Sequence, residues 1–326
     1  MMQVHVFNKQ SPSEDLQNKL FEFEKSFSYQ LSKHRHFYID HSPDYSAFYR
    51  AMGDANIIII EKNQKVIAVI SAVVREIEIN NQLEKIAYIG DLKIQEEYRR
   101  GPVLFRLFQK LQCILKDLKY GYAVVVEGTE VTPEHYTGRL GIPVFSETNK
   151  IQVLRFNLQD SRADSCIEMP EIFEMPKFCD FESGFEIYQE ILGNHPMMIA
   201  KAKPEIRSSI APQWMHLESL EGRACGMLDD TRKAERWYGL ENSKELRYAN
   251  IGYFVYQDPK AALSLIKSFM HAAKNTGYDG LSIALTEAQF LELSPYLQHL
   301  DHEKQMATLY ATHGHFKNLA INASEI

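Results

Sequence analysis

Two adjacent arginines and a glycine, Arg99-Arg100-Gly101, stand between an apolar segment at 85–94 and a proline, Pro102, that begins a second apolar pattern. This order predicts a strand, a loop and a helix. The first backbone N–H groups of a helix have no partners within the helix and carry partial positive charge, so they can hold a phosphate. Two arginines add charge-assisted hydrogen bonds, and a glycine lets a ligand approach the backbone closely. The segment therefore predicts a site for a pyrophosphate group.

The segments before this loop predict antiparallel strands. Two β-branched runs, 56–62 and 65–79, are joined by residues 63–64 and predict a hairpin. The run 85–94 predicts the next strand, and Gly90 within it is typical of a bulge. Upstream of the hairpin, we expect a helix around residues 13–33 and a short aromatic helix near 44–52.

The segments after the loop predict a crossover. Apolar residues recur at helical spacing from Leu104 to Leu118, and the nearly continuous apolar run 122–128 predicts a central strand. Because strand, helix and strand follow in order, a right-handed connection makes 85–94 and 122–128 parallel. A short helix is then expected after Thr132. Two further runs are expected to pair as strands and to close the first domain: 141–147 and 151–158.

Size and composition indicate a soluble protein of two domains. The chain has 326 residues, and one domain takes about 100–200 residues. A net charge of −7 argues against a nucleic-acid partner. No long apolar run or export signal is present, so we expect no membrane partner. Neither the four scattered cysteines nor the three histidines within 34–41 form a metal-ligand pattern, so we expect no metal site and a reducing, cytoplasmic setting. The predicted division is 1–158, a polar linker at 159–176, and 177–326.

The order of these elements, together with the stretch "GDLKIQEEYRRGPVLFRLFQKL", resembles the GCN5-related N-acetyltransferase (GNAT) superfamily over roughly residues 10–158. The stretch is similar to that family's cofactor motif, in which a strand leads through a loop of the form Arg/Gln-x-x-Gly-x-Gly/Ala into a helix. Here Tyr98 stands at the position of the Arg or Gln, and Val103 replaces the second glycine. The resemblance implies a mixed α/β fold, whose mostly antiparallel sheet has a splayed central parallel strand pair flanked by helices.

The resemblance also implies acetyl-CoA, or another acyl-CoA, as co-substrate. In the family the diphosphate binds the loop and the helix N-terminus, and the pantetheine arm bonds to the strand before the loop. The cofactor-binding residues implied here are Leu92, Lys93, Ile94, Arg99, Arg100, Gly101, Val103 and Leu104. The implied acceptor is an amine of a small molecule or a peptide.

Acyl transfer from a thioester to an amine needs a base for the ammonium and benefits from an acid for the leaving thiolate. Asp91 lies on the strand beside the expected thioester and Glu127 at the end of the neighbouring strand, so both are base candidates; either could instead only cap a turn. The family's acid is often the tyrosine of a Tyr-x-x-x-Gly-Phe pattern. The stretch "HYTGRLGI" offers Tyr136, one residue further from its glycine, with His135 as an adjacent substitute.

Residues 248–285 repeat the pattern of 88–126: a strand with Ile-Gly, a loop, a proline-started helix, Gly-Tyr and an apolar strand. We therefore expect two tandem acetyltransferase-like domains, with residues 222–240 as the hairpin of the second. In that copy "IQEEYRRGP" is shortened to "VYQDP", so both arginines and the glycine are missing. Asp258 stands where a phosphate would lie, and its charge would repel one. We expect a degenerate second copy that does not bind acyl-CoA.

Three functions stay open on these grounds. The first is an acyl-CoA-dependent N-acyltransferase, with acetyl as the acyl group. The second is a catalytically silent acyl-CoA-binding module that regulates or scaffolds a partner. The third is an aminoacyl or other long-donor transferase, which needs a broad basic face for tRNA that the net charge of −7 does not favour.

Overall fold

The N-terminal half is built from strands flanked by helices in the computed structural model, which describes residues 2–32, 35–79, 82–129, 131–138, 142–159, 176–193, 199–219, 222–312, 316 and 318–326. The predicted linker at 159–176 lies almost entirely outside the described residues. The strands of this half are β1 (Met2–Asn8), β2 (Tyr29–Ser32), β3 (Arg35–Asp40), β4 (Asp54–Lys62), β5 (Lys65–Ile79), β6 (Gln82–Ile94), β7 (Tyr120–Val126) and β8 (Ser146–Asn157). Its helices are α1 (Glu14–Glu24), α2 (Tyr45–Met52) and α3 (Val103–Leu115), with short 3₁₀ turns η1 (Glu96–Tyr98) and η2 (Pro133–His135).

The C-terminal half repeats this plan. Its strands are β9 (Lys177–Cys179), β10 (Gln213–Ser219), β11 (Gly222–Asp229), β12 (Arg236–Gly239), β13 (Glu245–Leu246), β14 (Tyr248–Tyr256), β15 (Gly280–Thr286) and β16 (His302–Ala311). Its helices are α5 (Phe181–Leu192), α6 (Pro204–Arg207), α7 (Pro259–Asn275) and α8 (Glu287–Leu297), followed by the 3₁₀ turn η3 (Ala323–Glu325). None of the helices in the described ranges has the length and apolar composition that crossing a membrane requires.

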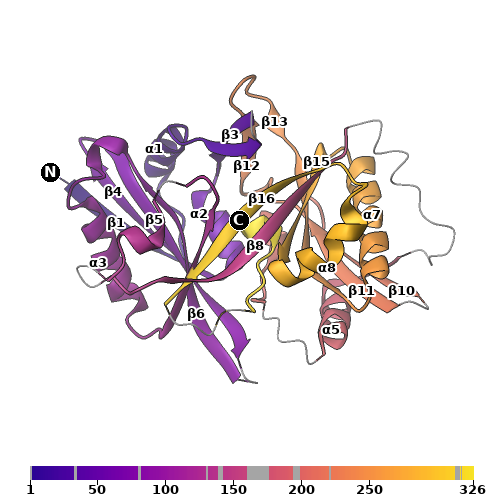
Figure 1. Cartoon of the computed structure of the whole chain (residues 1–326). Helices are drawn as coiled ribbons and strands as arrows, with labels where there is room; N and C mark the ends of the chain where they lie inside the picture. The colour runs from indigo at the N-terminus through magenta and orange to yellow at the C-terminus, as the bar shows by residue number, and fades with distance from the viewer. Residues whose placement is uncertain are drawn as a thin grey trace.

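One continuous sheet joins the two halves. Among the described residues it has twelve strands, in the order β1-β4-β5-β6-β7-β16-β8-β15-β14-β11-β10-β9. Figure 1 shows the N-terminal half on the left, the C-terminal half on the right, and β8 and β16 running between them. The predicted mixed α/β fold with two tandem copies is confirmed: β6 and β7 are parallel in the first copy, and β14 and β15 are parallel in the second.

Each half buries apolar side chains on both faces of its part of the sheet. In the first half, α1 and α2 contribute to an apolar cluster on one face, and α3 contributes to a cluster on the other. In the second half, α7 and α8 cover one face and α5 covers the other. Helices therefore pack on both faces of the sheet in each half and fix the positions of the two parallel strand pairs.

The predicted hairpin and crossover are present. Asn63 and Gln64 both have positive φ, 52° and 62°, as a two-residue turn between β4 and β5 requires. The predicted helix at 13–33 is wrong beyond Glu24, where α1 ends. The hydroxyl of Ser26 donates to the Phe23 carbonyl oxygen there, and the following residues form β2, which pairs with β3. Serine is a weak helix former, and the ladder with β3 satisfies the backbone instead.

Two strand predictions were also wrong because the halves exchange strands. Residues 142–145 form no strand with 151–158; β8 is one strand that pairs with β15 on one edge and with β16 on the other. The expected hairpin at 222–240 does not form either. β11 pairs with β10, and β12 joins a small sheet in the order β13-β12-β3-β2, which also links the two halves.

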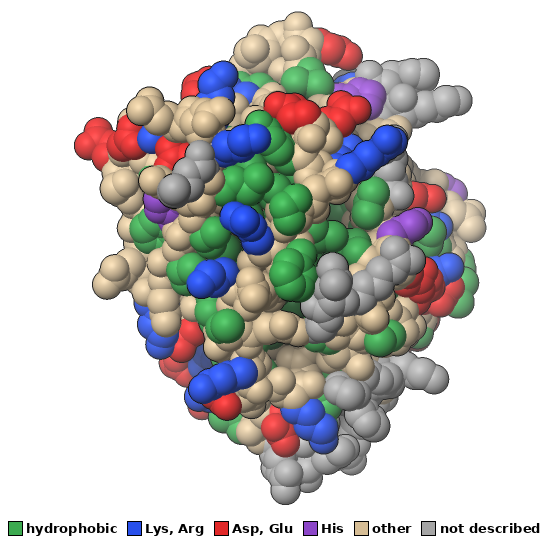
Figure 2. All heavy atoms as spheres, turned by 90° about the vertical axis from the view of Figure 1, so that its left-hand side faces the viewer, with side chains coloured by type: hydrophobic (Ala, Val, Ile, Leu, Met, Phe, Trp, Pro, Cys, Tyr) green, Lys and Arg blue, Asp and Glu red, His purple; other side chains and the backbone are tan. Residues whose placement is uncertain are grey.

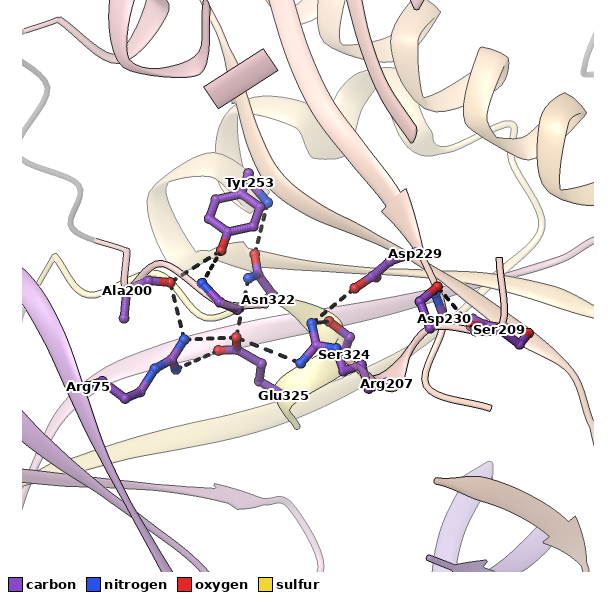
Figure 3. A network of polar contacts seen from close by, with 12 residues as sticks. Arg75, Ala200, Arg207, Ser209, Asp229, Asp230, Tyr253, Asn322, Ser324 and Glu325 are labelled. Atoms are coloured by element: carbon purple, nitrogen blue, oxygen red, sulfur yellow. Dashed lines mark hydrogen bonds and ion pairs between the residues drawn. The ribbon is translucent and has the colours of Figure 1, made fainter. Parts of the chain in front are cut away.

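Buried ion pairs anchor the C-terminal segment, residues 318–326, against both halves (Figure 3). Arg75 on β5 donates two hydrogen bonds to the Glu325 carboxylate, at 2.8 and 2.9 Å. Arg207 at the end of α6 pairs with Asp229 at 3.0 Å and lies 3.9 Å from Glu325. The side chains of Arg75 and Glu325 are each 1 % exposed. Because one unpaired charge at such depth is costly, this network holds the halves and the C-terminal segment together.

Candidate functional site

The first copy contains an open edge between its two parallel strands. β6 pairs with β5 as far as Ile94, but it pairs with β7 only from Ile86 to Tyr88. Beyond Tyr88, in the part of the chain that the structure describes, the β7-facing edge of β6 has no partner strand. Such an edge offers unpaired backbone groups to an extended ligand.

A bulge lies at the start of this open edge. Asp91 and Leu92 together stand opposite Ile70 of β5, between the pairs Ser71–Gly90 and Val69–Lys93. Asp91 has φ of 53°, a left-handed conformation that is uncommon outside glycine. The bulge predicted at Gly90 is therefore present, one residue further along the strand.

The predicted phosphate loop leads from β6 through η1 to the N-terminus of α3. Arg99 and Arg100 are exposed, and the Arg99 Nε–H donates to the Ile94 carbonyl oxygen at 3.3 Å. A Cβ at Gly101 would meet only the Tyr98 carbonyl oxygen at 3.6 Å, an ordinary contact, so the fold itself does not require glycine there. Figure 2 shows this side of the molecule, where Lys and Arg side chains flank apolar surface.

The first residues of α3 differ in what they can offer a ligand. The side chain of Val103 is buried and that of Leu104 is half-buried against the core under α3. Only their backbone N–H groups are suited to contact a bound anion, as the helix N-terminus allows.

Asp91 is held at the bulge by two neighbours. One carboxylate oxygen pairs with Lys93 Nζ at 2.6 Å, and the other accepts a hydrogen bond from the Tyr45 hydroxyl. The Asp91 side chain is 10 % exposed. Burial raises the pKa of Asp91, and the adjacent Lys93 ammonium opposes that rise. A carboxylate with a raised pKa at the edge of an open strand pair is suited to take up a proton.

A chain of buried charges continues from Lys93. Its Nζ donates to Glu24 Oε1 at 3.0 Å, Glu24 Oε1 pairs with His41 Nδ1 at 2.7 Å, and His41 Nε2 pairs with Glu235 Oε2 at 3.0 Å. The Trp237 indole N–H donates to the other oxygen of Glu235 at 2.9 Å.

The two central members of the chain are held ionised. Burial alone would raise the pKa of Glu24, but His41 and Lys93 lower it to about 2. Burial alone would likewise lower the pKa of His41, but Glu24 and Glu235 raise it to about 10. Sequence reasoning missed Glu24, His41 and Glu235, because residues 17 and 194 positions apart give no local signal.

The other predicted catalytic residues lie apart from Asp91. Glu127 is exposed just past β7, and its backbone N–H donates to the Met306 carbonyl oxygen at 2.8 Å. The Tyr136 ring packs against Phe108 of α3 with centroids 5.6 Å apart. Burial raises the pKa of Tyr136 to about 12, so the phenol keeps its proton at neutral pH. In the described part of the chain, no hydrogen bond or ion pair links Glu127 or Tyr136 to Asp91. The adjacent His135 completes a capping box with Thr132.

The second copy also has a bulged strand that leads to a helix N-terminus, but side chains of the protein itself bind the backbone N–H groups at both places. β14 carries a bulge of Tyr253 and Phe254 opposite Gly226. The Tyr253 N–H, however, donates to the Asn322 side chain of the C-terminal segment at 2.9 Å. The start of α7 is capped by its own carboxylate, since Asp258 accepts from the Lys260 N–H at 2.8 Å.

A pocket lies in the C-terminal half. It is lined by Arg232, Glu235 and Trp237, by Tyr248 and Asn250 of β14, and by residues 323, 324 and 326. It therefore connects to the Glu235 end of the charge chain. Within the described ranges, no group of three or more His, Cys, Asp or Glu side chains is arranged to hold a metal ion.

Comparisons with known proteins identify this architecture. Neither a scan against protein-family models nor a search of curated proteins found a match to the sequence. Among solved structures, Saccharomyces cerevisiae N-myristoyltransferase with bound myristoyl-CoA is similar, with a TM-score of 0.63 and 12 % identity over 94 % of this chain and 78 % of that one. A tandem GNAT protein from the clavulanic acid biosynthesis pathway, solved without acetyl-CoA, has a TM-score of 0.59 and 10 % identity over 95 % and 98 % of the two chains.

A third similar structure is a conserved protein from Enterococcus faecalis described as a probable N-acyltransferase. Its TM-score is 0.51 at 10 % identity, over 95 % of this chain and 72 % of that one. At these identities the likeness establishes the fold. The chain has a tandem GNAT-like fold.

Proposed function

We propose that the protein is an acyl-CoA-dependent N-acyltransferase whose N-terminal copy holds the acyl-CoA and transfers its acyl group, acetyl in our assignment, to an amine. The contrast between the two copies carries this proposal. The first copy keeps an open edge on β6 and two exposed arginines in the loop before α3, whereas Asn322 and Asp258 occupy the matching features of the second. The similarity to structures of acyl-CoA-dependent transferases supports it.

In this proposal the diphosphate binds Arg99, Arg100, Gly101 and the N–H groups of Val103 and Leu104. The pantetheine arm lies along Leu92–Ile94, so Arg99 must leave the Ile94 carbonyl oxygen when the ligand binds. Asp91 then lies beside the thioester.

The acceptor nitrogen loses two protons during the transfer. The Asp91 carboxylate takes one proton from the acceptor ammonium, and the neutral amine attacks the thioester carbonyl carbon. The new C–N bond forms and the C–S bond breaks. The second proton of the amine nitrogen goes to the leaving thiolate, with Tyr136 as the candidate donor in a relay. Asp91 returns its proton to solvent. Removing a positioned base of this kind lowers kcat by about 10²–10⁴-fold.

Calorimetric titration of the full chain with acetyl-CoA and with myristoyl-CoA tests the binding step. We expect binding that weakens at least about tenfold in an Arg99→Ala/Arg100→Ala variant, because two charge-assisted contacts are lost. The matched control is Lys110→Ala/Lys116→Ala, which removes two exposed charges, one within α3 and one at its C-terminal cap, and should leave the affinity unchanged. Equal weakening in both variants would mean that net charge, and not the loop, governs binding.

A second candidate function is a silent acyl-CoA-binding module. It is favoured by the engagement of Asp91 with both Lys93 and Tyr45, which leaves the carboxylate no oxygen without a partner. A thiol-release assay against a panel of primary amines separates the two functions. Tight acyl-CoA binding with no amine-dependent thiol release, in wild type and Asp91→Asn alike, would support the silent module.

A further inference from the structure

The charges that lead away from Asp91 alternate in sign. In order they are Asp91, Lys93, Glu24, His41 and Glu235, and each cation touches two carboxylates. None of these side chains is more than 10 % exposed. At such burial neighbouring charges influence one another much more strongly than on the surface.

Three carboxylates face two cations among these five buried groups. When all five groups are ionised, one negative charge is left uncompensated. Glu24 lies between both cations, and Glu235 accepts hydrogen bonds from His41 and from the Trp237 N–H. Asp91 has a single cationic neighbour, Lys93, and a neutral hydroxyl donor, Tyr45. The uncompensated charge is therefore most easily removed at Asp91, by a proton or by an approaching ammonium group.

We infer that Glu24, His41 and Glu235 are positioning residues that control how readily Asp91 takes up a proton. This inference rests on the proposed function, in which Asp91 is the base. Glu235 precedes β12 in the C-terminal half. The degenerate copy thus contributes a charge to the site of the first copy, which gives it a chemical role besides bracing.

The sign of each residue's effect follows from its charge. Glu24 and Glu235 add negative potential at Asp91 and favour its protonated form, whereas His41 adds positive potential and favours the carboxylate. The other titratable groups that face Asp91 are Lys93 on its own strand, Tyr29 of β2 and Tyr45 of α2. A network that only stabilises the fold would lower the melting temperature when broken, without moving the titration of Asp91 in a direction set by charge.

Carbon-13 NMR of the full chain, labelled at the aspartate carboxyl carbons, measures this titration without any ligand. The Asp91 resonance is assigned by its loss in Asp91→Asn. We expect the midpoint to move to lower pH in Glu24→Gln and, by less, in Glu235→Gln, and to higher pH in His41→Gln. The control is Glu22→Gln on the exposed side of α1, where the side chain is 73 % exposed, and no shift is expected.

Opposite shifts for the glutamates and the histidine support the inference. An unmoved midpoint, or shifts of one sign in all three variants, overturns it. Should the Glu24→Gln and His41→Gln variants fail to fold, Glu235→Gln decides. Glu235 is the last of the five charged groups, and glutamine keeps its shape and hydrogen-bonding capacity while removing one charge. Because no acyl-CoA or acceptor takes part, this result stands apart from the calorimetric and thiol-release tests of the proposed function.

Discussion

Asp91 and Tyr253 occupy equivalent positions in the two copies, and both adopt left-handed backbone conformations, with φ of 53° and 50°. Each begins the bulge in the strand that precedes its copy's crossover helix. Their side chains differ in what they contact. Asp91 faces Lys93 and Tyr45, whereas the Tyr253 hydroxyl accepts from the Ala202 N–H at 2.7 Å. The bulge with its left-handed first residue is therefore present in both copies, but the side chain at that position contacts different groups.

Replacing Arg75 tests how firmly the C-terminal segment is held. Arg75→Met leaves the buried Glu325 without its bidentate partner, and we expect a loss of about 3–5 kcal/mol in the free energy of unfolding. Denaturant titration followed by fluorescence measures it. Arg35→Met, which breaks an exposed pair with Glu303, should cost no more than about 1 kcal/mol. Similar losses in both variants would show that the buried network contributes no more to the free energy of unfolding than an exposed ion pair does.

Gly184 should resist the usual helix-stabilising replacement. It lies within α5, where alanine is normally favoured by about 0.5–1 kcal/mol. Here a Cβ would come within 2.2 Å of the Trp214 side chain, which is fully buried. We expect Gly184→Ala to lower the melting temperature by several degrees, and a scanning fluorimetry curve that does not move would contradict this packing.

Gly101 should show the opposite pattern. A Cβ there meets only an ordinary contact, so Gly101→Ala should leave the melting temperature unchanged. If a diphosphate approaches this backbone closely, the same change should weaken acetyl-CoA binding several-fold in calorimetry. Unchanged affinity in a folded variant would argue against close approach at this residue.

His41 should make stability depend on pH. Its pKa is raised from the usual 6.5 to about 10, so its contribution is fully present below pH 6.5 and is lost as the pH rises through 10. The difference in melting temperature between wild type and His41→Gln should therefore be large at pH 6 and shrink towards pH 10. Ile86→Val, an uncharged change at a buried site, serves as the control and should show a constant difference.

Much of the first copy could be predicted because its signals are local. The β-branched runs, the turn at residues 63–64 and the apolar spacing after Pro102 determine β4, β5 and α3 almost without help from the rest of the chain. The repeat at 248–285 could be recognised for the same reason. The bulge near Gly90 was also foreseeable, although its exact residues depend on pairing with β5.

The strand exchange could not be predicted, because apolar periodicity shows which face of β8 is buried but not which strand it pairs with. Its partners, β15 and β16, come from the other half of the chain. The charge chain was missed for a related reason. Lys93 and Glu24 are 69 positions apart, and the resemblance pointed to Lys93 only for its backbone.

We propose that the first copy alone binds the nucleotide, at the start of α3 and along the open edge of β6. A crystal structure of the full chain with acetyl-CoA would locate the nucleotide. We predict the diphosphate against the N–H groups at Val103 and Leu104, and the pantetheine arm beside Leu92–Ile94. A diphosphate found at the start of α7 near Asp258, or an arm lying along β14, would contradict it.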